Sequence, residues 1–113
     1  MRITSFGFKY GGPNADARNL VLDVRPLFQR NPYRRRDLRY KRGDDPEVIA
    51  DILRTPGFAA SYAKLKARVA KASPAVERVW LGCTGGHHRS VMLANRLGAE
   101  LGVAVDHRDY ERR

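Results

Sequence analysis

The sequence lacks the features that would point to a membrane or extracellular protein. It contains a single cysteine, Cys83, so no internal disulfide can form. Its apolar runs fall far short of the roughly 20 residues that span a bilayer. Residues 1–6 enter a strand-like pattern directly, without the apolar stretch of a signal peptide. These absences predict a cytoplasmic protein with no membrane partner.

Acidic residues are also scarce. The chain has 12 Asp and Glu residues against 22 Lys and Arg residues, a formal net charge of +10, and most of the basic residues are Arg. Guanidinium groups pair bidentately with phosphate and stack on bases, so this composition favours a polyanionic partner. An Arg-rich coding bias would produce the same excess without any function. The charge therefore predicts a polyanionic partner, such as a nucleic acid or an acidic protein.

The positive charge is concentrated in one segment, residues 25–42. It holds eight basic residues against one acidic residue, Asp37, which leaves +7 of the total +10. Tyr33 and Tyr40 lie among these basic side chains, as a surface that stacks and neutralises a nucleic acid requires. We expect the following residues to contact nucleic acid: Arg30, Arg34, Arg35, Arg36, Arg39, Lys41 and Arg42.

The length of 113 residues and the 42% hydrophobic content predict a single domain, residues 1–113, with one core. The apolar patterns and the positions of Gly and Pro predict strands at 2–8, 19–24, 76–81 and 103–105, and helices at about 46–55, 57–72 and 89–101. This ββααβαβ order predicts an α/β fold with a small, mostly parallel sheet and helices packed on it. The nearly continuous apolar run at 19–24 predicts a central strand covered on both faces, with Asp23 and Arg25 paired near its carboxyl end.

A glycine-rich loop between a predicted strand and a predicted helix is the main functional signal. Backbone N–H groups converge at such a junction and the helix dipole is positive there, so it predicts a site for phosphate. Gly85 and Gly86 are expected to adopt positive φ and to approach the anion closely. Thr84 and Ser90 add hydroxyl donors and Arg89 adds a forked charge. We expect the whole loop to contribute to the ligand site, namely Cys83, Thr84, Gly85, Gly86, His87, His88, Arg89 and Ser90. Of the two adjacent histidines, His88 is preferred as the one that faces the anion, in which case His87 faces solvent or caps the helix.

The same loop has the Cys-x5-Arg spacing of cysteine-dependent phosphatases, with Cys83 as nucleophile and Arg89 as phosphate ligand. Gly82 occupies the position where such phosphatases usually have His, and the general acid could only be sought among Asp44, Asp45 and Asp109. A small buried residue at a strand end is the favoured role for Cys83, and no catalytic residue is predicted. Zinc bound by the cysteine and the three histidines lacks ligand spacing, so no metal is predicted either. The loop therefore predicts a ligand that bears a phosphate group, and no cofactor.

Five motifs, spread over nearly the whole chain, resemble one family. They are Ser5-Phe6-Gly7-Phe8-Lys9-Tyr10-Gly11, Asp23-Val24-Arg25, Asn31-Pro32, Gly82-Cys83-Thr84-Gly85-Gly86-His87-His88-Arg89-Ser90-Val91 and His107-Arg108. In these motifs the chain resembles the C-terminal domains of RNase adapter proteins of the RapZ family. The resemblance implies an oligomeric adapter that binds small regulatory RNA and a nucleotide sugar without catalysis. It implies these pocket positions: Lys9, Asp23, Arg25, Asn31, Gly85, Gly86, His88, Arg89, Ser90, His107 and Arg108.

The chain departs from that family in three respects. No Gly-x4-Gly-Lys-Ser motif occurs, so nucleotide hydrolysis is not implied. The region from Pro46 to Pro74 is shorter, and the basic tail is reduced to Arg112-Arg113. Three functions therefore compete: a module that senses a phosphate compound or nucleotide sugar and meets RNA or a separate protein, a phosphoryl-transfer enzyme, and a protein-interaction module with a vestigial pocket. The first is the favoured one, and a homo-oligomer is expected.

Overall fold

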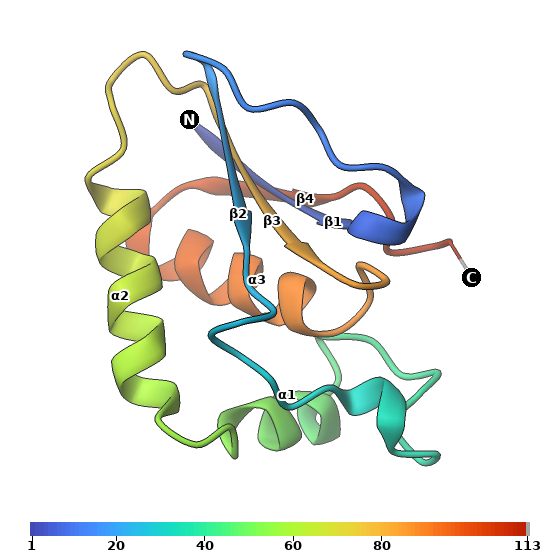
Figure 1. Ribbon diagram of the computed structural model, residues 1–113. Helices are drawn as coiled ribbons and strands as arrows, with labels where there is room; N and C mark the ends of the chain where they lie inside the picture. Colours follow the sequence, from blue (N-terminus) through green and yellow to red (C-terminus); the bar gives the residue numbers. More distant parts are fainter. Residues whose placement is uncertain (113) are drawn as a thin grey trace.

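A computed structural model describes residues 1–112 (Figure 1). Four strands form an all-parallel sheet in the order β2-β3-β1-β4, with short 3-10 helices η1 and η2 in the loops. The element order confirms the predicted ββααβαβ arrangement and the α/β class. The bounds are β1 Arg2–Gly7, η1 Phe8–Tyr10, β2 Asn19–Asp23, η2 Pro32–Arg34, α1 Pro46–Leu53, α2 Phe58–Ala70, β3 Arg78–Cys83, α3 Arg89–Leu101 and β4 Ala104–His107.

The position of β2 differs from the prediction. The strand pairs only with β3 and lies at an edge of the sheet, so the expectation of a central strand is wrong. Leu20 and Leu22 pack against the core, which explains the apolar pattern, while the opposite face of the strand carries Asn19, which accepts a hydrogen bond from the Trp80 indole. The central strands are β1 and β3. An apolar run of strand length therefore identified a buried face but not the position of the strand in the sheet.

The helices begin where the sequence predicts. Asp45 caps α1 by accepting a hydrogen bond from the Glu47 backbone N–H at 2.9 Å, and Pro46 takes the first helical position. The end of α3 at Leu101, followed by Gly102, also agrees with the sequence pattern. None of the helices within residues 1–112 is long and apolar enough to cross a membrane.

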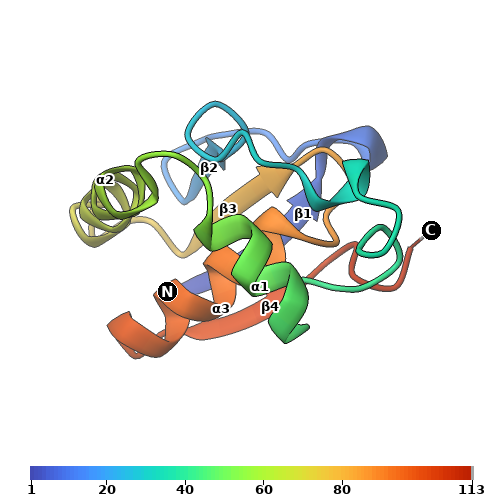
Figure 2. The same ribbon diagram turned by 90° about the horizontal axis from the view of Figure 1, so that it is seen from below.

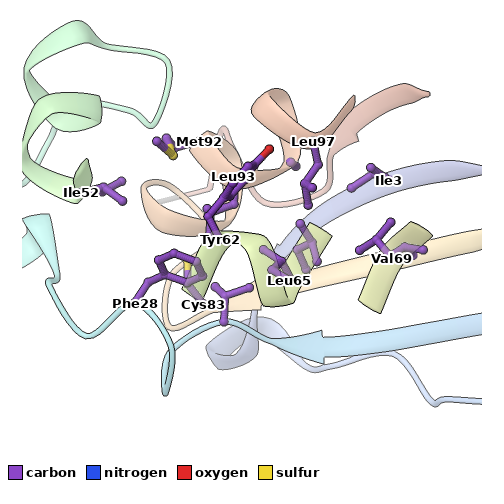
Figure 3. Close-up of a cluster of buried hydrophobic side chains, with 14 of the residues drawn as sticks. Ile3, Phe28, Ile52, Tyr62, Leu65, Val69, Cys83, Met92, Leu93 and Leu97 are labelled. Carbon is purple, nitrogen blue, oxygen red and sulfur yellow. The ribbon is translucent and has the colours of Figure 1, made fainter. Parts of the chain in front are cut away.

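One hydrophobic cluster lies between the sheet and all three helices (Figure 3). Ile3 of β1 and Val79 of β3 form its floor. The helices contribute Ile52 from α1, Tyr62, Leu65 and Val69 from α2, and Met92, Leu93 and Leu97 from α3. Cys83 is the last strand residue of this cluster, so the core extends to the carboxyl end of β3.

The carboxyl ends of the parallel strands bring distant loops together. Residues 8–10 follow β1, residues 24–42 follow β2, and residues 84–88 follow β3. These segments therefore lie together at the carboxyl ends of the strands (Figure 2). In open parallel sheets, ligands bind in crevices outside these strand ends. The fold therefore places the basic segment beside the glycine loop.

Candidate anion-binding site

The glycine loop, residues 84–88, is built against the end of β1. Gly86 has a φ of 77°, as predicted, whereas Gly85 does not share the positive φ that was expected of it. A Cβ on Gly7 would lie 2.4 Å from the Gly85 carbonyl carbon, and a Cβ on Gly86 would lie 2.6 Å from the Gly7 nitrogen. Backbone packs directly on backbone here, which requires glycine on both sides.

Three distant segments fix this loop. The Lys9 backbone N–H donates to the Thr84 carbonyl at 3.1 Å, and the Gly43 N–H donates to the His87 carbonyl at 2.7 Å. Behind the loop, the buried Asp109 carboxylate accepts from the Gly7 N–H at 2.7 Å. Lys9 and Gly43 therefore hold the loop by backbone hydrogen bonds, and Asp109 holds the Gly7 backbone on which the loop packs. These contacts fix the loop conformation without a ligand.

A cavity of about 360 Å³ opens beside the loop, near the lower end of the range of about 300–1,000 Å³ for ligand pockets. Most of the predicted ligand residues line it, together with three residues of the basic segment. The predicted ones are Lys9, Asn31, Cys83, Thr84, Gly85, His87, His88 and Arg89; the others are Tyr33, Arg39 and Tyr40. Both tyrosines are exposed, which leaves their rings accessible at the mouth of the cavity.

Arg89 is the distinctive charge of this cavity. Its side chain is buried, with the residue only 5% exposed, and its Nη1 donates to the Phe28 carbonyl at 3.0 Å. Its Nε is buried and has no hydrogen-bond partner, and within residues 1–112 no carboxylate lies within ion-pair distance of it. Burial lowers the pKa of Arg89, and the positive charges of Arg25 and Arg34 act in the same direction. The protein therefore holds a buried guanidinium whose charge and donors are incompletely satisfied.

The rest of the lining combines cationic and aromatic side chains with small or uncharged polar residues. The Arg39 guanidinium lies over the Tyr33 ring, 4.6 Å from its centroid, and the Arg39 Nε donates to the Tyr33 carbonyl at 2.9 Å. Asn31 caps η2 by accepting from the Tyr33 N–H at 3.2 Å, which fixes the start of this wall. No Asp or Glu of residues 1–112 lines the cavity, whereas Lys9, Arg39 and Arg89 all do. The cavity is therefore suited to an anion.

The two histidines differ from the prediction. Both are buried and both line the cavity, so the expectation that His87 faces solvent or caps the helix is wrong. The His87 Nε2 contacts the Arg112 carbonyl oxygen, which turns this ring toward the C-terminal segment. His88 stands at the N-cap position of α3 and makes no side-chain capping bond.

Some predicted ligand residues lie outside this cavity. Asp23 and Arg25 form the predicted ion pair at 2.8 Å, and the Arg25 guanidinium stacks 4.3 Å from the Phe8 ring centroid. The hydrogen bond from Arg25 lowers the pKa of Asp23. Gly86 supports the loop backbone and does not line the cavity, and Ser90 is fully buried beneath it, with its Oγ 3.1 Å from the Cys83 sulfur.

His107 and Arg108 also lie outside the cavity. The His107 ring bridges the Ser5 hydroxyl at 2.6 Å and the Asn95 side-chain oxygen at 2.9 Å, so it ties β1 and β4 to α3. Burial lowers the pKa of His107. Arg108 pairs with Asp109 at 2.8 Å, behind the glycine loop. In this structure both residues support the site rather than face the cavity.

The basic segment divides into paired and unpaired side chains. The buried Asp51 carboxylate accepts from Arg30 at 2.9 Å and from Arg35 at 3.3 Å. Lys41 pairs with Glu47 and Arg42 with Glu111, each at 2.8 Å. Within residues 1–112, Arg34 and Arg36 are exposed and form no ion pair. The segment is therefore anchored by its own salt bridges, and only part of its charge is available to a partner.

Sequence reasoning missed two features of this region. The first is the contribution of Tyr33, Arg39 and Tyr40 to the cavity, which their position shortly after Asn31-Pro32 could have suggested. The second is the anchor, Asp51, which lies on the buried face of α1 with Val48 and Ile52. An acidic residue at an apolar helical position requires a buried partner, and that pattern was visible in the sequence.

The geometry also bears on catalysis. A Cβ on Gly82 would lie 2.4 Å from the Phe6 ring, so there is no room for a histidine before the cysteine. None of the three candidate acids lines the cavity: Asp45 caps α1, Asp109 holds Gly7, and Asp44 accepts from the Tyr110 hydroxyl. Within residues 1–112 no group of three or more His, Cys, Asp or Glu side chains could hold a metal ion.

Comparison with known proteins agrees with the motifs. The family model for the RapZ C-terminal domain matches residues 1–111. A nucleotide-binding protein of Limosilactobacillus fermentum is 42% identical over 124 residues, covering 99% of this chain and 42% of that protein. A nucleotide-binding protein of Thermus thermophilus is 42% identical over 128 residues, covering 99% and 43%. One of Deinococcus radiodurans is 41% identical over 122 residues, covering 96% and 42%. The chain spans about two fifths of the length of these relatives, and it belongs to the RapZ C-terminal domain family.

Proposed function

We propose that this domain binds a phosphate-bearing small molecule, such as a nucleotide or a nucleotide sugar, in the cavity beside residues 84–88, and that it acts by binding rather than by catalysis. The observation that carries the proposal is Arg89. Among residues 1–112, its buried guanidinium has an unpartnered Nε and lies on the wall of a cavity that no carboxylate lines. The names of the relatives support a ligand of the nucleotide class.

The expected binding mode follows from charge and geometry. A phosphate group supplies negative charge and several acceptor oxygens, and a guanidinium binds it through two parallel hydrogen bonds. The N-terminus of α3 adds its dipole, and Lys9 and Arg39, which line the same cavity, add positive charge. Tyr33 and Tyr40 offer ring faces to the base or sugar of the ligand.

A thermal-shift titration tests this proposal, with inorganic phosphate, a sugar phosphate, UMP and a UDP-sugar as ligands. A ligand bound only by the folded protein at 100 times its Kd adds about 2.7 kcal/mol of stability, which corresponds to a Tm increase on the order of 10 °C for a domain of this size. The same titration is made with Arg89→Met, and with Arg68→Ala as a matched control, since Arg68 is exposed on α2 and far in sequence from the cavity segments.

The two variants should differ in their Tm response to phosphate. Arg89→Met removes an incompletely compensated buried charge, so we expect a higher Tm in phosphate-free buffer and no phosphate-induced shift. Arg68→Ala should keep the full shift. A wild-type protein that none of the four ligands stabilises, or an Arg89→Met protein that responds like the wild type, would refute the proposal.

The same proposal includes an adapter role in which the unpaired charges of the basic segment contact RNA. Among residues 1–112, Arg34 and Arg36 are exposed and form no ion pair, and the nearby side chains of Tyr33 and Tyr40 in the same segment are exposed as well. Binding to a single-stranded RNA should weaken steeply with salt, because each neutralised phosphate releases counterions. Removing both arginines should reduce the slope of log K against log salt by roughly 1–2. Equal binding at low and high salt would refute RNA binding by these charges.

A phosphatase function has less support. The part of the chain that the structure describes supplies the cavity with a thiol and an arginine, but with no Asp or Glu to protonate a leaving group. We expect no turnover of an aryl phosphate, and we expect Cys83→Ser to retain phosphate binding. Turnover that disappears in Cys83→Ser would favour the enzyme instead.

A further inference from the structure

Cys83 lies where the hydrophobic core meets the cavity. It ends β3, belongs to the core cluster beside Phe28 (Figure 3), and lines the cavity. The residue is only 3% exposed, and its sulfur is 3.1 Å from the Ser90 hydroxyl. It is the only cysteine of the chain, so any reaction of a thiol in this protein occurs at this position.

The positive charges around the Cys83 thiol favour negatively charged reagents. Arg89 follows it around the glycine loop, lines the same cavity and carries the buried, unpartnered Nε. Lys9 and Arg39 form other parts of the wall, and among residues 1–112 no acidic side chain does. A small molecule that reaches Cys83 from the cavity therefore passes between cations. Clefts lined by one sign of charge raise the local concentration of oppositely charged molecules by roughly 10 to 1,000 fold.

We propose that Cys83 is a modification site selective for small anionic electrophiles, which bind through their negative group near Arg89 and then alkylate the sulfur. This inference rests on the proposed function, because it uses the same anion-binding cavity. With iodoacetate, the sulfur attacks the carbon that bears iodine. The C–S bond forms as the C–I bond breaks, iodide leaves with the electron pair, and the thiol proton passes to the buffer.

The product has a consequence for the cavity. The S-carboxymethyl group carries a carboxylate covalently attached to one wall, within the space that the phosphate of a ligand would take. Modification at Cys83 thereby closes the anion site, and the protein gains a means of switching ligand binding off in response to such compounds. A neutral reagent of the same size, iodoacetamide, has no electrostatic attraction to the cavity and should react more slowly.

The test compares the rates of alkylation of the folded protein by iodoacetate and iodoacetamide, followed by intact mass. The uncharged thiol 2-mercaptoethanol provides the reference ratio of the two rates. We expect the ratio of iodoacetate to iodoacetamide to exceed that of 2-mercaptoethanol by about tenfold or more at low salt, and to fall toward it at 1 M salt. Arg89→Met should lower the ratio toward that of 2-mercaptoethanol, whereas Arg68→Ala should leave it unchanged. Carboxymethylated wild type should lose the phosphate-induced Tm shift.

Two results would overturn the inference: a rate ratio equal to that of 2-mercaptoethanol at low salt, or alkylation by either reagent only after denaturation. Cys83→Ser must remain unmodified throughout. The salt dependence of wild type makes the test independent of any variant that fails to fold. A phosphate-induced Tm shift without selective alkylation would refute only the modification site, and selective alkylation without any ligand-induced shift would refute only the proposed function.

Discussion

Among the glycines of residues 1–112 with positive φ, Gly86 is the one whose replacement by alanine should destabilise the protein most, and Gly57 provides a matched control. Gly86 has a φ of 77°, and a Cβ there would lie 2.6 Å from the Gly7 nitrogen and 2.9 Å from the Phe6 carbonyl carbon. Gly57 has a φ of 72°, but a Cβ there would meet no atom within 4 Å. Gly57→Ala therefore introduces backbone strain alone, while Gly86→Ala introduces the same strain and a clash with backbone.

The expected magnitudes follow from these two contributions. A left-handed backbone conformation costs an alanine about 1–2 kcal/mol. Forcing extra atoms into a packed site costs about 1–3 kcal/mol more. We expect Gly57→Ala to lose about 1–2 kcal/mol of unfolding free energy and Gly86→Ala about 2–5 kcal/mol, measured by urea denaturation. The corresponding decrease in Tm is about 4 °C per kcal/mol.

The two variants should also differ in ligand response. Gly86→Ala separates the glycine loop from β1, so the phosphate-induced Tm shift should be lost, whereas Gly57→Ala, which lies before α2, should keep it. Equal losses of stability in the two variants would show that the backbone contact with Gly7 does not constrain the loop. A Gly86→Ala protein that binds phosphate with the Kd of wild type would contradict the role of this conformation in the site.

Three further substitutions test other parts of the fold. Asp51→Ala leaves Arg30 without its buried partner. Because Arg30 is partly exposed, we expect a loss of about 1–2 kcal/mol of unfolding free energy in urea denaturation, with faster proteolysis of the basic segment. Unchanged proteolysis would show that this ion pair does not anchor the segment. Tyr62→Phe removes the hydrogen bond to Glu100 at 2.8 Å and should cost about 1 kcal/mol of unfolding free energy. In a Glu100→Ala background the same substitution should cost much less, and an equal cost in both backgrounds would show that this hydrogen bond does not stabilise the fold. Burial lowers the pKa of His107 below its ordinary 6.5, so as the pH falls the unfolded chain takes up the proton before the folded protein does. The contribution of His107 to stability should therefore be complete above pH 6.5 and decrease as the pH falls below it. His107→Gln should remove this pH dependence of the urea midpoint.

The local features of this protein could be predicted from the sequence because they depend on neighbours along the chain. Asp45-Pro46 predicts the start of α1 by its capping chemistry. The strand, glycine loop and helix at residues 78–101 follow from a change of apolar period around Gly85-Gly86. The Asp23–Arg25 ion pair follows from the alternation of side chains along a strand. Each of these patterns involves only a few consecutive residues, so the tertiary fold does not alter it.

The tertiary structure alone decided which of these pieces meet. Periodicity shows that β2 has an apolar face, but the order of parallel strands depends on pairing between residues far apart, and it places β2 at the edge. His87 is buried because the C-terminal segment folds back onto it, and Arg39 joins the cavity because Asp51 holds the basic segment against α1. Composition and spacing predicted that an anion would bind at the glycine loop. The cavity forms where the loops that follow three parallel strands meet at the carboxyl ends of those strands. Residues from all three loops are far apart in the sequence, so no local pattern predicts that they meet.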